Sequence, residues 1–467
     1  MGVNMYKGKL ALMAALLAGT AGTALAQDGA TTLQEAVEVA MAANPEILQA
    51  QYNKEAIEFE RRQAEGLYAP RVDVEASGGI RRLENNTRRT LGIADRELYP
   101  LEANIRGDWA LVDFGRRRGE VLRQAARVDG ASMRVEERSE FIALQVARQY
   151  FDILLQQRVV AASQDNVLFH ERLAGDLAEG VRQQSISVAD QQQAEERLQS
   201  ALVRQTEAVE DLENAKTALR RLTGLDISQV VAPPDLSAAL PPNIDSAVGL
   251  ARLNNPLVNE AQADVDAAHG LVKSAKGDLF PTIGVEVVGR VGEDIDGFDG
   301  DTNDVMARGY IRWNVFDSGI NRAKHQEMVR RASQARYRLH ELQRQAEEDV
   351  RNAYIAMDAQ TNITSQLQRQ SQVSDDLLLS YRSQFNVGRR SLLDVLDAQN
   401  TRYNTQVRLE TARFSKQFAE YQALAATNRL LEALSVAPGE GAGENERDEH
   451  NYGPRPPAEL QYRNKTD

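Results

Sequence analysis

Four segments of the chain alternate apolar with polar residues, and this two-residue period is typical of β-strands with one apolar and one polar face. In the first pair of segments the apolar series are Val72, Val74 and Ala76, and Ala103, Ile105, Gly107, Trp109 and Leu111. In the second pair they are Ile283, Val285, Val287 and Gly289, and Gly309, Ile311, Trp313 and Val315. Each segment contains about ten residues, the length at which a tilted strand crosses a lipid bilayer.

Apolar residues also return every seven positions, a spacing typical of helices that pack as coiled coils. One series is Val146, Ile153, Val160, Val167, Ala174 and Val181, and another contains Val350, Met357, Leu378 and Phe385. The first series lies in a predicted helix from Arg116 to about Arg182, and at 1.5 Å per residue this helix is roughly 100 Å long. No globular domain needs a helix of that length.

Short motifs indicate that the chain contains the same unit twice. Asn44-Pro45 recurs as Asn255-Pro256, and each pair is typical of a helix start, because asparagine caps the helix and proline suits its first position. The segment 109–115 recurs as 313–319, with Trp, Asp and Gly at matching places. We therefore predict an α+β fold, dominated by long helices, in which a helix–β-hairpin–long helix–helix unit is duplicated.

The units are expected at 27–224 and 245–434, joined by a proline-rich linker at 225–244. Residues 435–467 are rich in glycine, proline and charge, so this tail is predicted to be disordered. Residues 1–26 have the features of a secretory signal peptide: Lys7 and Lys9, a short apolar stretch, and small residues before Gln27. The apolar stretch is too short for a membrane anchor helix.

Composition narrows the class of protein. The chain has no cysteine, which suits an oxidising compartment and excludes a lipid anchor attached through cysteine. The formal net charge of −13 disfavours non-specific binding to nucleic acid. The five histidines are scattered without metal-ligand spacing, and neither a phosphate-binding glycine loop nor a nucleophile elbow is present. We therefore expect no enzyme activity, no cofactor and no metal site.

Strands that enter a membrane cannot leave open sheet edges, and closed barrels need at least eight strands. This chain offers four, so membrane insertion would require several copies. Trp109 and Trp313 lie near the strand ends next to the long helices, where an aromatic girdle belongs. The alternative is a small water-exposed sheet that caps a helical stalk.

These features resemble the TolC family of outer-membrane efflux and type I secretion proteins over about residues 31–434. The most specific motif lies between Gly388 and Gln399, with Arg390, Asp394 and Asp397 inside it. The resemblance implies a homotrimer in the outer membrane, with a shared 12-stranded β-barrel and a long periplasmic α-helical tunnel. It also implies a periplasmic adaptor (membrane fusion) protein and an inner-membrane ABC or proton-driven pump as partners.

The implied function is an exit duct of a tripartite efflux or type I protein secretion system. The absence of a lipidated cysteine favours the secretion-type members. Two alternatives stay open: a structural coiled-coil stalk protein of the envelope, and a dedicated multidrug or metal efflux duct.

The resemblance assigns Asp394 and Asp397 to carboxylate rings that select ions at the closed periplasmic tip. Three residues apart, they share one helix face. A second interpretation is local, because Ser391-x-x-Asp394 and Ser187-x-x-Asp190 are both capping boxes. Capping does not account for Asp397, whose counterpart in the first unit is Gln193.

The resemblance also assigns Arg390 to a latch that holds the tip shut, with Asp190 as its expected partner. Phe385 stands where the family has tyrosine, so one hydroxyl link of the latch is lost. The first turn also lacks the glycine that the second has at Gly388. The alternative for Arg390 is a solvated surface side chain.

The second hairpin loop is acidic, with Glu293, Asp294, Asp296, Asp299, Asp301 and Asp304. Phe298 at the third ligand position breaks the EF-hand pattern, so a solvated loop is expected. The alternative is that the acidic loop contacts the arginine-rich first loop of a neighbouring copy, or divalent cations of the outer leaflet.

Overall fold

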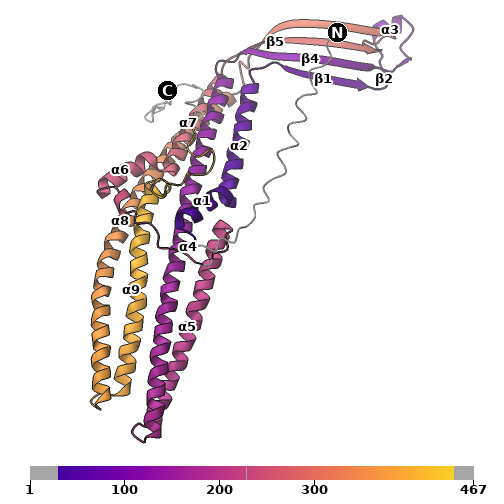
Figure 1. Cartoon of the computed structure of the whole chain (residues 1–467). Coiled ribbons are helices and arrows are strands. Elements are labelled where there is room, and N and C mark those ends of the chain that lie inside the picture. The colour runs from indigo at the N-terminus through magenta and orange to yellow at the C-terminus, as the bar shows by residue number, and fades with distance from the viewer. Residues whose placement is uncertain (1–29, 228, 446–467) are drawn as a thin grey trace, which may run out of the picture.

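The structure is a computed structural model that describes residues 30–227 and 229–445. The predicted signal peptide and residues 446–467 lie outside this described part. The molecule is elongated, with a β-sheet at one end and two helical hairpin tips at the other (Figure 1). Within the described residues, no helix combines the length and the apolar character needed to span a lipid bilayer.

The element order follows the predicted duplication. The first unit contains α1 (Leu33–Ala43), α2 (Pro45–Gly66), β1 (Arg71–Gly78), β4 (Leu101–Val112), α4 (Arg116–Arg182) and α5 (Val188–Thr223). The second contains α6 (Ile244–Asn254), α7 (Pro256–Gly277), β5 (Thr282–Glu293), β6 (Asp301–Arg312), α8 (Ile320–Asn386) and α9 (Leu392–Ala426). Short elements are β2 (Arg81–Arg82), α3 (Asn86–Thr90), β3 (Glu97–Leu98), a 3₁₀ turn (Ser237–Ala239) and α10 (Leu430–Leu434).

The repeated motifs perform the same local task in both units. The side-chain oxygen of Asn44 accepts a hydrogen bond from the backbone N–H of Glu46 at 2.9 Å, and Asn255 accepts one from Leu257 at 3.0 Å. At the strand-to-helix turn, Asp113 and Asp317 each accept bonds from two backbone N–H groups of the following residues. The duplicated sequence therefore encodes duplicated helix starts.

The strands form one antiparallel sheet in the order β1-β4-β5-β6. Its register aligns Val74, Ile105, Gly289 and Val305 in one row across the sheet. Apolar side chains gather on this face and are exposed, with Val74 75% and Val305 81% exposed. The outer edges of β1 and β6 have no strand partner in the described part of the chain.

The opposite face of the sheet is polar. Glu286 on β5 forms ion pairs with Arg106 on β4 and with Arg308 on β6. Arg290 pairs with Glu102 at 2.7 Å. The predicted alternation thus yields a sheet with an apolar face and a charged face joined by cross-strand ion pairs.

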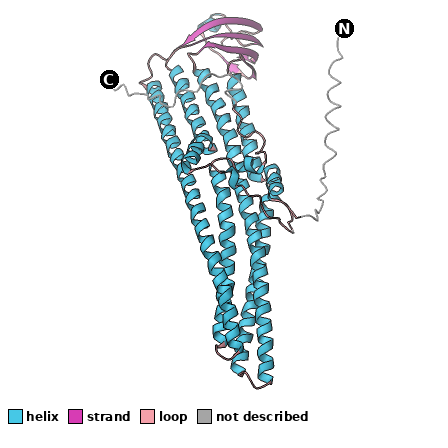
Figure 2. Ribbon diagram, turned by 60° about the vertical axis from the view of Figure 1, so that its left-hand side comes forward, coloured by secondary structure: helices cyan, strands magenta, loops and turns pink. Residues whose placement is uncertain are grey.

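The two 67-residue helices α4 and α8 run almost the whole length of the helical part (Figures 1 and 2). Toward the sheet α4 packs against α2 and α7, and toward the tips it packs against α5 and α9. The shorter helices follow one another in line, α2 above α5 and α7 above α9 (Figure 1). The side-chain amide of Asn44, before α2, donates to the carbonyl of Leu222 in α5 at 3.0 Å.

Three tyrosines fasten the linker to the helices at mid-height. The hydroxyl of Tyr150 lies 2.8 Å from the carbonyl of Thr31 and 2.7 Å from that of Val231, whose N–H donates to it. Tyr354, its counterpart in the second unit, donates to Pro241, and Tyr421 donates to Pro234. These hydrogen bonds therefore hold the linker in a defined position across the helices, next to the main apolar core.

The prediction of a disordered tail is wrong for residues 435–445. Val436 is 7% exposed and joins the main core. The N–H of Gly439 donates to the hydroxyl of Ser139 at 3.0 Å, and Glu444 forms an ion pair with Lys54. Composition indicated disorder, but a single buried apolar residue and specific backbone bonds hold this segment against α2 and α4.

We expect Tyr150→Phe to destabilise the protein by about 1–3 kcal/mol, because it leaves several buried backbone groups of the linker region without their partner. Tyr354→Phe is the matched control, since it removes one bond at the equivalent position and should cost less. Thermal unfolding followed by circular dichroism measures both. Equal midpoints for wild type and Tyr150→Phe would contradict the fastening role.

Candidate functional site

The candidate site is the pair of helical turns at the end of the molecule opposite the sheet (Figures 1 and 2). One turn joins α4 to α5, and the other joins α8 to α9. Gly388 adopts a left-handed conformation with φ of 73°, and Gln184 adopts the same conformation at the matching place with φ of 61°. A non-glycine residue there costs about 1–2 kcal/mol, so the first turn keeps the shape of the second at some strain.

Ser391 and Ser187 are the N-caps of α9 and α5, and Asp394 and Asp190 lie in the first turns of these helices. Ser391 and Asp394 form a complete capping box, in which the Asp394 carboxylate accepts from the Ser391 hydroxyl at 2.7 Å and from its N–H at 3.3 Å. Asp190 accepts from the hydroxyl of Ser187 at 2.7 Å. The hydrogen bonds from Ser391, assisted by the nearby Arg390 guanidinium, hold the pKa of Asp394 below its usual range. The predicted capping box is therefore confirmed for Asp394, whereas at Asp190 the structure shows only the bonds with the Ser187 hydroxyl.

Asp397 lies one helical turn beyond Asp394 on α9 and is exposed. It forms neither a hydrogen bond nor an ion pair with any residue in the described part of the chain. Contacts within one chain therefore assign no structural role to the Asp397 carboxylate. The ring role predicted for both carboxylates needs further copies of the chain and stays a prediction.

Arg390 is held by its own helical hairpin. Its guanidinium stacks over the ring of Tyr381 at 4.1 Å, and its Nε donates to the side chain of Gln384 at 3.2 Å. Its Nη1 lies 3.8 Å from the Asp394 carboxylate. Within the described residues of one chain it forms no ion pair with Asp190, so a latch between these two residues stays a prediction. Tyr381, which lies about one helical turn before Phe385 on α8, was not among the residues predicted for the site.

Phe385 joins the two hairpins by apolar contact. It packs against Leu173 and Leu177 of α4 and against Leu392 and Leu396 of α9, in a cluster that also contains Ala194. A second cluster places it beside Leu378 and Val395. This apolar cluster connects the two hairpins near their tips.

Polar bonds between the hairpins lie above this cluster. The side-chain amide of Gln399 donates to Asn166 at 2.9 Å, and both side chains are buried. Arg204 donates to Asn400 at 2.9 Å. Because a buried amide must keep its partner, these bonds fix the register of one hairpin against the other.

The acidic loop between β5 and β6 is bound by the arginine-rich loop of the same chain. Arg88 is fully buried and donates to the carbonyls of Gly297, Ile93 and Arg96. Arg96 also lies 3.6 Å from Asp299. The arginine-rich loop, considered as an alternative partner from a neighbouring copy, thus contacts the acidic loop within one chain. In the described part of the chain, no group of three or more His, Cys, Asp or Glu side chains could hold a metal ion.

Comparison with known proteins agrees with this architecture. The sequence model of the outer membrane efflux protein family matches residues 36–225 and 247–434. The chain is 24% identical to the outer membrane efflux protein BepC of Brucella suis over 61% of its own length and 63% of BepC. It is 20% identical to the outer membrane protein TolC of Escherichia coli, over 83% of this chain and 80% of TolC.

The fold is also that of a solved channel. The crystal structure of the Campylobacter jejuni CmeC outer membrane channel superposes with a TM-score of 0.77 at 15% identity, over 90% of this chain and 89% of CmeC. Because the family model matches most of the sequence, the chain belongs to the outer membrane efflux protein family. The predicted resemblance and the long-helix fold are confirmed.

Proposed function

We propose that three copies of this chain form an exit duct in the outer membrane, which passes substrate from an inner-membrane pump to the exterior. The observation that carries the proposal is the four-stranded sheet with two open edges, one exposed apolar face and one charged face. In a bilayer the open edges of β1 and β6 must be paired, because lipid offers no hydrogen bonds. Pairing β1 of one copy with β6 of the next closes three sheets into twelve strands.

The two faces of the sheet fit this arrangement. Val74, Ile105 and Val305 would face lipid, and the ion pairs around Glu286 would line a wet interior. A water-exposed sheet on a stalk would instead leave a continuous apolar face in water, which soluble proteins avoid. This contrast favours the duct over the structural stalk protein.

The tryptophans support the same placement. The indole N–H of Trp109 donates to the carbonyl of Tyr68 at 2.9 Å, and that of Trp313 donates to Leu279 at 3.3 Å. Both bonds tie the helix-proximal end of a strand to the loop before the hairpin of the same unit. An indole with a polar partner and an exposed ring suits the membrane–water boundary.

We assign the partners by family membership: a periplasmic adaptor protein and an ABC or proton-driven pump of the inner membrane. The helical part would then extend into the periplasm and present the tips to these partners. A pump must supply the energy, since the duct has no nucleotide-binding motif. Type I protein secretion and small-molecule efflux are both compatible with this arrangement.

The purified full chain in mild detergent is expected to be a trimer and to form ion-conducting pores in planar bilayers. The edges of β1 and β6 have no other way to be paired in lipid. Mass measurement of the detergent complex and single-channel recording test the two claims. A monodisperse monomer without conductance would reject the duct.

Removal of the carboxylates at the tip should change the ion selectivity of the pore. Three copies of Asp394 and Asp397 would place six carboxylates at one constriction, which attracts cations. We expect Asp394→Ala combined with Asp397→Ala to lower the cation preference by at least about twofold and to weaken block by trivalent cations. Asp397→Ala alone should carry more of the effect than Asp394→Ala.

The matched control is Ser187→Ala, which removes the N-cap of α5 in the first unit and leaves every tip carboxylate in place. Loss of a cap alone costs about 0.5–2 kcal/mol of stability. Reversal potentials measured in a salt gradient separate the roles. If the double variant, like Ser187→Ala, gives the wild-type reversal potential, neither Asp394 nor Asp397 takes part in ion selection.

Variants of Arg390 test whether an ion pair between neighbouring copies holds the tip shut. If Arg390 pairs with Asp190 of a neighbouring copy, Arg390→Ser should raise single-channel conductance or open probability. Each half-exposed pair contributes only about 0–1 kcal/mol, but three act together on one gate. Arg390→Asp should open the tip further, and adding Asp190→Arg should partly close it. Equal conductance in all of these variants would leave Arg390 as a helix-turn residue.

A further inference from the structure

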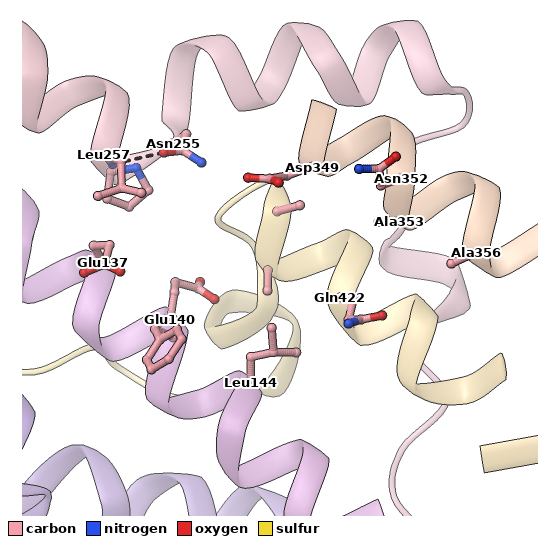
Figure 3. A pocket seen from close by; sticks show the side chains of 14 residues that line it. Glu137, Glu140, Leu144, Asn255, Leu257, Asp349, Asn352, Ala353, Ala356 and Gln422 are labelled. Atoms are coloured by element: carbon pink, nitrogen blue, oxygen red, sulfur yellow. Dashed lines mark hydrogen bonds between the residues drawn. The ribbon is translucent and has the colours of Figure 1, made fainter. Parts of the chain in front are cut away.

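A pocket of about 550 Å³ lies between α4 and α8, at the place where α9 ends and α7 begins (Figure 3). Three carboxylates line it: Glu137 and Glu140 from α4 and Asp349 from α8. Apolar side chains supply much of the remaining wall, including Phe141, Leu144 and Leu257. No residue of the tips or of the sheet takes part, so this pocket is separate from the candidate gate.

Glu140 is the unusual group in this pocket. The residue is 7% exposed, and its Oε1 accepts a hydrogen bond from the backbone N–H of Leu431 at 3.2 Å. Its Oε2 is buried and has no hydrogen-bond partner among the described residues. The side chain points into the pocket from α4 (Figure 3). A buried carboxylate oxygen without a partner is costly and calls for a ligand that completes it.

The neighbouring charges do not supply that partner. Arg138 and Arg134 lie on the same stretch of α4 as Glu140, but both pair with Glu137, at 2.6 and 3.2 Å. Arg138 also pairs with Glu46 and stacks over Phe141. The pocket therefore contains an acid whose positive counterpart is missing.

The other carboxylates around the pocket strengthen this imbalance. Burial, with a smaller contribution from the nearby Glu136 and Glu432, raises the pKa of Glu140 to about 8. Burial also raises the pKa of Asp349 on the opposite wall, with Glu348 adding to the effect. In the empty pocket Glu140 is thus mostly neutral near pH 7, and an arriving cation would ionise it.

The side chains that line the pocket indicate which kind of cation it would bind. No group of three metal-type ligands exists in the described part of the chain, so the carboxylates are not arranged to hold a bare metal ion. Apolar side chains beside a single buried acid suit an organic body with one positive group, and the volume suits a small molecule. We propose that this pocket binds a lipophilic organic cation, whose ammonium group contacts Oε2 of Glu140 while its apolar body packs against Phe141, Leu144 and Leu257.

The proposal can be tested by calorimetric titration of the full chain in mild detergent with 1-naphthylmethylamine. Its neutral analogue 1-naphthalenemethanol is the ligand control, because it has the same body without the charge. We expect the amine to bind at least about tenfold more tightly than the alcohol, since only the amine forms a charge-assisted bond. Equal affinities, or an amine that does not bind, would overturn the proposal.

The variant Glu140→Gln keeps the size of the side chain and removes its charge. It should lower amine affinity by about tenfold or more. Glu171→Gln is the matched control, because Glu171 is an exposed residue of the same helix, away from the pocket. If Glu140→Gln and Glu171→Gln bind the amine equally, Glu140 does not hold the ligand.

A second variant leaves Glu140 intact. Ala356→Trp fills the pocket from α8 and should abolish amine binding, whereas unchanged binding would place the ligand elsewhere. Proton release gives an independent readout. Because a bound cation lowers the pKa of Glu140, binding should release a proton, and affinity should rise between about pH 6.5 and 8.5. Binding heats that do not depend on the ionisation heat of the buffer would contradict this linkage.

Discussion

A helix of 67 residues must bury an apolar seam along its whole length, and this constraint organises the molecule. Neither α4 nor α8 finds one partner long enough. Pairs of shorter helices that follow one another in line cover them instead. The pair α2 and α5 packs against α4, and the pair α7 and α9 packs against both α4 and α8. Wherever one short helix ends and the next begins, backbone groups lose their helical partners. The linker and the three tyrosines that bind it lie at the height of these junctions.

The junction between α5 and α2 and the junction between α9 and α7 differ in how the space beside the helix start is filled. Between α5 and α2, Asn44 both caps α2 and donates to the carbonyl of Leu222, so the gap is closed. Between α9 and α7, Asn255 caps α7 in the same way but lines a pocket. Glu140 is buried in the wall of this pocket. The residue at the matching position of the second unit is Arg344. The duplicated architecture thus keeps the helix starts and allows the spaces beside them to diverge.

Sequence reasoning succeeded where the signal is local. The bounds of α4, the Asn-Pro helix starts and the alternation of the strands all follow from neighbouring residues. It failed where partners are distant in sequence. Nothing in the composition of 435–445 reveals that the N–H of Gly439 meets Ser139, and nothing near Glu140 reveals Leu431. Arg390 shows the same limit, because its stacking on Tyr381 depends on how the turn folds back.

The capping and ring interpretations of the tip reinforce each other. In a ring of three copies, repulsion between like charges would raise the pKa of the carboxylates and tend to neutralise them. The Ser391 bonds and the nearby Arg390 guanidinium act on Asp394 in the opposite direction, so this carboxylate keeps its charge more readily. A capping box at the start of α9 therefore suits Asp394 to keep its charge in a ring of like charges.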